Sequence, residues 1–181
     1  MAELNMKCEL SVMMISPIMY GDPLIKAIYE QNTKLGNSYK LNIQSCQCLE
    51  NEPSLLDDLN SGESGKFKFD FIVLVMDSRL RDSVMKAEEN INHVPNFYLT
   101  CKRIAFVSGV ARMTEHNAWD LRRKYNCPAL VGNILDPKAC ECLARRILKL
   151  IEFTLGSTTG LPNITYKESY EDIGSKSSFK K

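Results

Sequence analysis

The sequence lacks an excess of charge of either sign, and its N-terminal region lacks an apolar run longer than a strand. Lys and Arg together number 23 and Asp and Glu 22, which gives a formal net charge of +1. No global basic field would attract nucleic acid, so direct DNA contact is not expected, although residues 175–181 form a small basic end. Acidic side chains within residues 1–16 argue against a secretory signal or a transmembrane helix. We therefore expect an intracellular chain with no membrane partner.

A metal-binding arrangement of cysteine and histidine is also missing. The seven cysteines include two C-x-C pairs, Cys46/Cys48 and Cys140/Cys142, and the two histidines lie far from both pairs in sequence. Zinc motifs usually leave a wider gap between their cysteines, and the simplest state of intracellular cysteines is a free, partly buried thiol. The sequence therefore predicts no bound metal.

Apolar stretches of strand length alternate with amphipathic helical stretches along the chain. We expect strands at residues 8–16, 39–47, 69–77, 101–109 and 128–134, helices at 23–36, 81–94, 115–125 and 136–156, and at most a short helix near 53–62. The unbroken apolar run at 69–77 is typical of a central strand covered on both faces. This alternation predicts an α/β fold with three layers, in which a mainly parallel sheet of about five to six strands lies between helices.

The length of 181 residues suits one domain, and no internal repeat is evident. We expect a single domain over residues 1–166, followed by a flexible, polar and basic-ended tail over 167–181.

Residues 16–23 follow the frame of a phosphate-binding loop, which is written G-x-x-x-x-G-K-[ST]. Ser16 stands for the first glycine, Gly21 for the second, Asp22 for the lysine and Pro23 for the Ser/Thr. A carboxylate at ~4 Å from a phosphate charge would be repelled by about 4 kcal/mol at an effective dielectric near 20, and proline has no hydroxyl for Mg²⁺. We interpret Asp22 as a helix N-cap and Pro23 as the first helical residue, so no nucleotide site is predicted.

The other motifs of a guanine-nucleotide switch are missing as well. After the strand expected at 101–109, Gly109, Val110 and Arg112 stand where an N-K-x-D motif would place its amide, lysine and carboxylate. No D-x-x-G motif separates the second and third expected strands, and we interpret Asp77 as a residue of a turn or helix start.

No catalytic signature is present elsewhere. Ser108 does not lie in a G-x-S-x-G elbow, and no local pattern joins Cys101 or Cys127 to His93 or His116. The sequence therefore predicts a non-enzymatic protein without a cofactor or a small-molecule substrate. The alternative is a divergent nucleotide-dependent switch similar to small GTPases, and nucleotide binding would distinguish the two.

Three stretches, residues 69–109, 122–131 and 142–164, resemble the centromere protein M family. The features that carry this resemblance are the order of strands, an Asp before the strongest strand, the helical segment EENINHV, the tripeptide Gly-Leu-Pro after the last helix and the degenerate phosphate loop. The resemblance extends over about residues 10–166, while the basic tail departs from the family pattern.

The resemblance implies a small-GTPase-like fold without nucleotide-binding residues, that is, a pseudo-GTPase. It also implies a scaffold subunit of the inner kinetochore, located at centromeres in the nucleus and acting in mitotic chromosome segregation. The implied partner is the α-solenoid subunit centromere protein I, which the chain would bind and stabilise in an assembly that also contains centromere proteins H and K.

Apolar residues outside the main expected elements are candidates for partner binding. They are Phe97, Tyr98 and Leu99 in a connection, and Leu161, Ile164 and Tyr166 beyond the last helix. Such residues need cover, either by folding back onto their own domain or by serving as anchors in a partner's hydrophobic groove. The sequence leaves both alternatives open.

Overall fold

The computed structural model describes residues 9–37, 39–61, 68–110 and 117–155, with the side chains of 117–119 left out. Five strands form one sheet in which all neighbouring strands are parallel, in the order β2-β1-β3-β4-β5. They are β1 (Glu9–Ile15), β2 (Lys40–Cys46), β3 (Phe71–Met76), β4 (Ile104–Ser108) and β5 (Ala129–Val131). The predicted α/β class and parallel sheet are confirmed, whereas the small-GTPase-like subtype stays a prediction.

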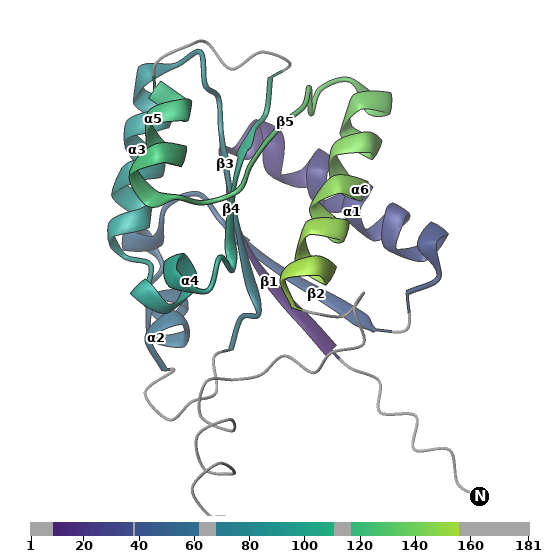
Figure 1. Cartoon of the computed structure of the whole chain (residues 1–181), viewed down its shortest axis with the longest axis horizontal. Helices are drawn as coiled ribbons and strands as arrows, with labels where there is room; N and C mark the ends of the chain where they lie inside the picture. Colours follow the sequence, from purple (N-terminus) through teal and green to yellow (C-terminus); the bar gives the residue numbers. More distant parts are fainter. Residues whose placement is uncertain (1–8, 38, 62–67, 111–116, 156–181) are drawn as a thin grey trace, which may run out of the picture.

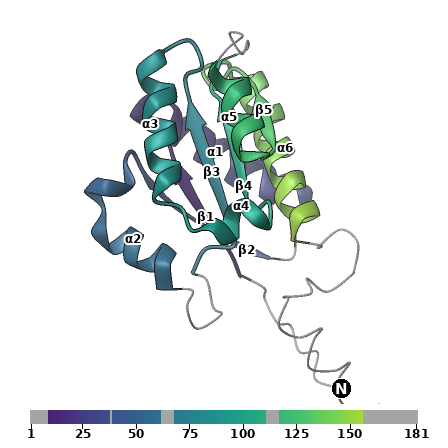
Figure 2. The ribbon, with the colours of Figure 1, turned by 60° about the vertical axis from the view of Figure 1, so that its left-hand side comes forward.

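Helices cover both faces of the sheet and make the three layers (Figures 1 and 2). One face carries α1 (Ile18–Leu35) and α6 (Pro137–Thr154). The other face carries α2 (Pro53–Asn60), α3 (Arg81–Asn92), α4 (Asn96–Thr100) and α5 (Asn117–Tyr125), with a short 3₁₀ helix η1 (Leu49–Asn51) before α2. No helix in the described part of the chain is long and apolar enough to cross a membrane.

Strand β3 is buried throughout, as expected for a central strand, and its side chains alternate between two hydrophobic clusters. Phe71, Val73 and Val75 belong to the cluster under α1 and α6. Ile72 and Leu74 belong to the cluster under the opposite helices. Because each such side chain stabilises the fold by about 1.5–3 kcal/mol when fully buried, this strand anchors both layers.

Polar side chains join α1 to α6 on their shared face. The buried amide of Gln31 donates to Glu141 (3.3 Å) and accepts from Arg145 (3.2 Å). At the start of α6, the carboxylate of Asp136 accepts from the backbone N–H of Lys138 (3.1 Å), which confirms the predicted N-cap.

Two local predictions were wrong. Helix α1 begins at Ile18 with Pro17 as its N-cap residue, so Asp22 and Pro23 lie inside the helix and neither caps it. The segment expected as a plain connection around Phe97 contains the short helix α4.

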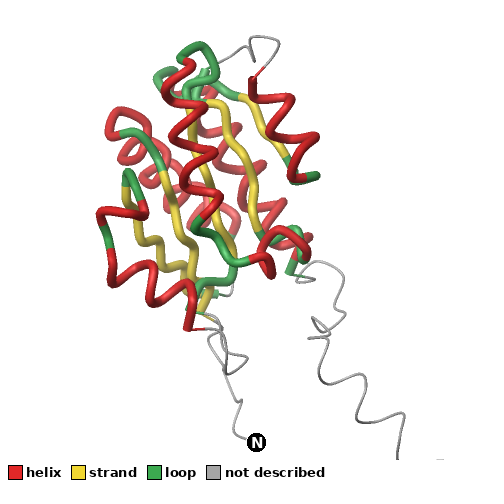
Figure 3. Tube along the Cα trace, turned by 90° about the vertical axis from the view of Figure 1, so that its left-hand side faces the viewer, coloured by secondary structure: helices red, strands yellow, loops and turns green. Residues whose placement is uncertain are grey.

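The two edges of the sheet differ in what surrounds them. Helix α4 leads into the start of β4, and α6 ends at this same amino-terminal edge, at the bottom of Figure 1. All strands end at the opposite, carboxyl edge, where β1 leads into α1 and β3 leads toward α3. Figure 3 shows the strands of the sheet in yellow among the red helices.

Candidate functional site at the carboxyl edge of the sheet

In doubly wound parallel sheets, ligands bind outside the carboxyl ends of the strands, where the strand order reverses direction. In the order β2-β1-β3-β4-β5 this switch point lies between β1 and β3. The chain segments that leave these two strands, residues 16–20 and 77–80, therefore define the candidate site.

The ring of Tyr20 packs beside this switch point, against the segments that follow β3 and β4. Tyr20 is the third residue of α1 and is 0% exposed. A Cβ atom added at Gly109, just after β4, would lie 3.1 Å from the Tyr20 ring. The Tyr20 hydroxyl donates a hydrogen bond to Oδ2 of Asp77, just after β3, at 2.8 Å. One side chain from α1 thus contacts the segments that follow β3 and β4.

The carboxylate of Asp77 is neutralised from within the chain. Arg79 donates to Oδ2 from Nη2 (2.8 Å) and to Oδ1 from Nε and from its backbone N–H (3.0 Å each). Hydrogen bonds from Arg79, with that from Tyr20, lower the pKa of Asp77 to about 2 against the opposing effect of burial. Burial, followed by the contact with Asp77, raises the pKa of Tyr20. Asp77 is therefore a turn residue held by internal partners, which agrees with the turn role predicted for it.

In the degenerate phosphate loop, two of the N–H groups are already used inside the helix. The N–H groups of Tyr20 and Gly21 donate to the carbonyl of Pro17 (3.0 and 3.2 Å), because α1 has already begun. Ser16 is buried, and a Cβ at Gly21 would lie 2.7 Å from its Oγ. Asp22 lies exposed on the outside of the helix. The structure thus brings Ser16 and Gly21 together and directs Asp22 to solvent.

At the switch point the surface is hollowed between the ends of β1 and β3, the start of α1, the residues after β2 and α3. This cavity has a volume of about 600 Å³. Ile18 and Met19 form part of its wall and are 71% and 55% exposed. Asn90 of α3 also lines the cavity. Its Oδ1 accepts from the backbone N–H of Leu49 at 2.8 Å and so holds the segment after β2 that forms the neighbouring wall.

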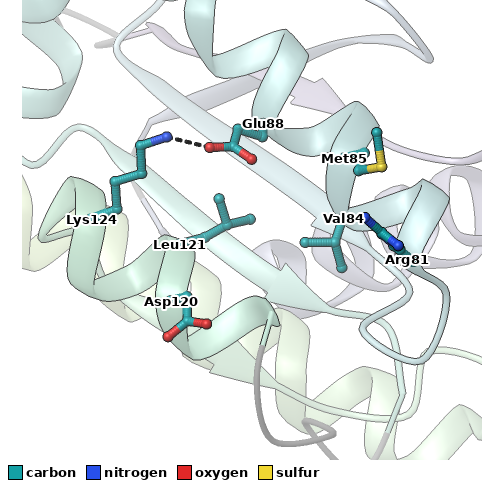
Figure 4. A pocket seen from close by; sticks show the side chains of 7 residues that line it. All are labelled: Arg81, Val84, Met85, Glu88, Asp120, Leu121 and Lys124. Atoms are coloured by element: carbon teal, nitrogen blue, oxygen red, sulfur yellow. Dashed lines mark hydrogen bonds and ion pairs between the residues drawn. The ribbon is translucent and has the colours of Figure 1, made fainter.

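A second cavity of about 250 Å³ lies between α3 and α5 (Figure 4). Val84 and Leu121 from the two helices form its apolar base, and Lys124 pairs with Glu88 across it. It contains no nucleophile beside a base, so it offers no catalytic chemistry. Within the described ranges, no group of three or more His, Cys, Asp or Glu side chains could hold a metal ion.

The predicted partner-binding residues divide into three groups. Tyr98 is 0% exposed and its hydroxyl donates to the carbonyl of Phe69 at 2.8 Å. Burial raises the pKa of Tyr98 to about 12. For Tyr98, the alternative of folding back onto the domain is therefore correct.

Phe97 and Leu99 are partly buried against the same cluster, and the guanidinium of Arg103 lies 5.1 Å from the Phe97 ring centre. Leu161, Ile164 and Tyr166 lie outside the described residues. Sequence reasoning missed Tyr20, whose burial is signalled only by the helical stripe that it shares with Leu24, Ala27 and Ile28.

Comparison with known proteins gives one family. The family model for Centromere protein M matches residues 58–170. No curated protein sequence matches the chain. Among solved structures, the chain is similar to a diflavin flavoprotein A3 from Nostoc sp. at 13% sequence identity and a TM-score of 0.45, over 84% of this chain and 97% of that chain. So distant a likeness carries no argument about function.

Proposed function

The chain belongs to the centromere protein M family, and from this premise we propose that it is a non-enzymatic structural subunit of the inner kinetochore. Membership of the family supports a kinetochore-associated role at the centromere. The finer proposal is that the chain binds and stabilises the α-solenoid subunit centromere protein I, in an assembly with centromere proteins H and K.

The observation that supports a scaffold rather than a switch is the internal contact of Tyr20 and Arg79 with Asp77 at the carboxyl edge. The buried Tyr20 donates to Asp77, and Arg79 already satisfies the carboxylate of Asp77. A nucleotide switch needs a γ-phosphate and its Mg²⁺ to hold mobile loops. Here a side chain of the same molecule holds the segments after β1 and β3 together, so a nucleotide-dependent switch is the less favoured alternative.

We propose that the partner docks at the amino-terminal edge, around α4 and the chain that follows α6. Phe97 and Leu99 present partly buried apolar side chains there, resting on a rigid support that includes the buried Tyr98. Interface anchors are typically well packed on their own side, which limits the entropy lost on binding. Leu161, Ile164 and Tyr166 follow α6 in sequence and complete the proposed contact set.

The test combines Leu99→Glu with Ile164→Glu and measures co-purification with centromere protein I. A carboxylate in an apolar interface is either desolvated without a partner or leaves the contact open, which costs a few kcal/mol, that is, at least about tenfold in affinity. Leu80→Glu is the matched control, because Leu80 is 56% exposed at the carboxyl edge and carries the same substitution.

We expect the double variant to lose the partner and the control to retain it, while circular dichroism shows both folded. Retention by a folded double variant would place the partner on another surface. Loss of the fold would assign these two residues to the core and also reject this docking site.

We also propose that residues 1–166 act as one domain and that 167–181 form a tail. Limited proteolysis of the full chain should cut first beyond residue 166, because exposed, polar termini are preferred cleavage sites. Early cuts within 117–155 would contradict this boundary.

A further inference from the structure

The carboxyl edge carries an apolar surface that the proposed kinetochore contact does not use. We propose that the basic C-terminal segment of this same chain, residues 175–181, docks on that edge around Ile18 and Met19. The proposal is independent of the contact proposed at α4, which lies at the opposite edge of the sheet.

The docking surface is defined by two adjoining hollows on either side of Ile18. The larger is the cavity of about 600 Å³ beside Met19, floored by Ile15, Leu74 and Ala87. The smaller, of about 240 Å³, lies between Ile18, the end of β2 and the outer side of α1. An exposed aliphatic pair between two hollows can receive one aromatic side chain, since such a ring buries a large apolar area at small entropic cost.

The charges around these hollows are mostly negative. The charged side chains that line them are Glu50, Lys86 and Glu89 for the larger hollow and Asp22 and Glu52 for the smaller. Glu50 lies 3.4 Å from His93, whereas no side-chain hydrogen bond or ion pair involves Asp22, Glu52 or Glu89 within the part of the chain that the structure describes. Four carboxylates to one lysine favour a cationic ligand.

The occupant is chosen by charge and by reach. The segment at 175–181 reads SKSSFKK, so it combines one aromatic residue, Phe179, with Lys176, Lys180 and Lys181. The described chain ends at Leu155, and the roughly 20 residues before Lys176 can span up to roughly 70 Å when extended. The seven-residue strand β1 separates the two edges by only about 23 Å. Even when residues 161–166 are held at the amino-terminal edge, the nine residues from 167 to 175 can span up to roughly 30 Å, so the segment can still reach the hollows of its own molecule.

Tethering makes even a weak contact significant. A flexible linker holds its end at an effective concentration of roughly 1 mM, so a contact with an intrinsic dissociation constant of roughly 0.3 mM would cover the surface about three quarters of the time. Because the contact relies on charge, it weakens as salt shortens the Debye length from about 10 Å at 0.1 M to about 3 Å at 1 M.

The thiol of Cys48 reports on this contact, because Cys48 lines the larger hollow and is partly exposed. The test uses the full chain with Cys8, Cys101 and Cys142 changed to Ser, and an uncharged maleimide as the probe. The rate at which the maleimide labels Cys48 is compared between the chain with the natural tail and a chain that carries Lys176→Gln, Phe179→Ser, Lys180→Gln and Lys181→Gln. In the matched control, Cys48 is changed to Ser and Cys101, at the amino-terminal edge, is kept as the labelled thiol.

We expect Cys48 to react about fourfold faster with the altered tail, or with the natural tail at 1 M salt, while Cys101 reacts at an unchanged rate. Carbodiimide coupling of the monomer should join the tail lysines to Asp22, Glu50, Glu52 or Glu89. Equal Cys48 rates for the two tails, or coupling to carboxylates elsewhere, would overturn the proposal. Coupling found only between two copies would overturn it in favour of a second copy as the occupant.

Discussion

The variant Tyr20→Phe removes one hydroxyl and so tests the hydrogen bond to Asp77 separately from the packing of the ring. The ring stays against Gly109, while the 2.8 Å hydrogen bond to Asp77 is lost. A buried hydrogen bond to a charged acceptor contributes about 1.5–3 kcal/mol to stability. We expect the lower end of this range, because Arg79 still donates to the same carboxylate oxygen at 2.8 Å. With a urea m-value of about 2 kcal/mol/M, the midpoint should fall by about 0.7 M.

The loss should depend on pH in a defined direction. The folded-state pKa of Asp77 is lowered from 3.8 to about 2, first by the hydrogen bonds from Arg79. Its ionisation therefore contributes about 2 kcal/mol that is fully present above pH 3.8 and is lost as the pH falls through about 2. Tyr20→Phe removes part of this contribution, so the difference between variant and natural protein should be constant from about pH 5 to 8 and shrink below about pH 3.

The matched control is Tyr98→Phe, which removes a hydroxyl of equal burial from a neutral acceptor, the carbonyl of Phe69. Its cost should be about 0.5–1.5 kcal/mol, without the change at low pH. Urea unfolding followed by circular dichroism measures both variants across the pH range. If Tyr20→Phe costs no more than Tyr98→Phe, or its cost is the same at all pH values, the hydroxyl does not hold Asp77 in its ionised form and the reasoning fails.

Three further predictions concern the same edge and the helix starts. GTP, GDP, ATP and ADP with Mg²⁺ should not bind, because Asp22 and Pro23 stand where a phosphate loop needs its lysine and its Mg²⁺-binding hydroxyl; a calorimetric affinity near micromolar, about −8 kcal/mol, would refute this. Asp22→Ala should change the free energy of unfolding by less than about 0.5 kcal/mol, whereas Asp136→Ala should cost about 0.5–2 kcal/mol, because only Asp136 caps its helix; equal melting temperatures for the two variants would contradict the assignment. Gly109→Ala should cost about 1–3 kcal/mol, because its Cβ would lie 3.1 Å from the Tyr20 ring; an unchanged unfolding midpoint would show that the ring can move aside.

The strands could be predicted from the sequence because their signals are local. The buried run of β3 and the alternating pattern of β2 are complete within a few residues, and parallel order follows from the helices between them. The cap of α6 was equally local, with Asp136 directly before a proline.

The start of α1 could not be placed by the same rules. An Asp-Pro pair usually marks a first turn, yet here the helix continues back through Pro23 to Ile18. A proline inside a helix removes one N–H donor and presses on the carbonyl four residues before it. Tyr20 and Leu24 lie on one stripe of the helix and are both 0% exposed, and the burial of these two side chains outweighs that cost. This burial depends on strands that lie far away in sequence.

The contact between Tyr20 and Asp77 spans 57 positions, so no local pattern could reveal it, and yet it decides how this edge behaves. A ligand can shift a conformational equilibrium only if it binds two states differently and can also leave. Tyr20 is covalently part of the chain, and its hydroxyl donates to a carboxylate that Arg79 keeps ionised, so this contact forms without any ligand. The two segments at the switch point are thereby fixed in one arrangement. A fixed support of this kind suits the scaffold role proposed above better than a nucleotide-dependent switch, because it does not depend on a ligand.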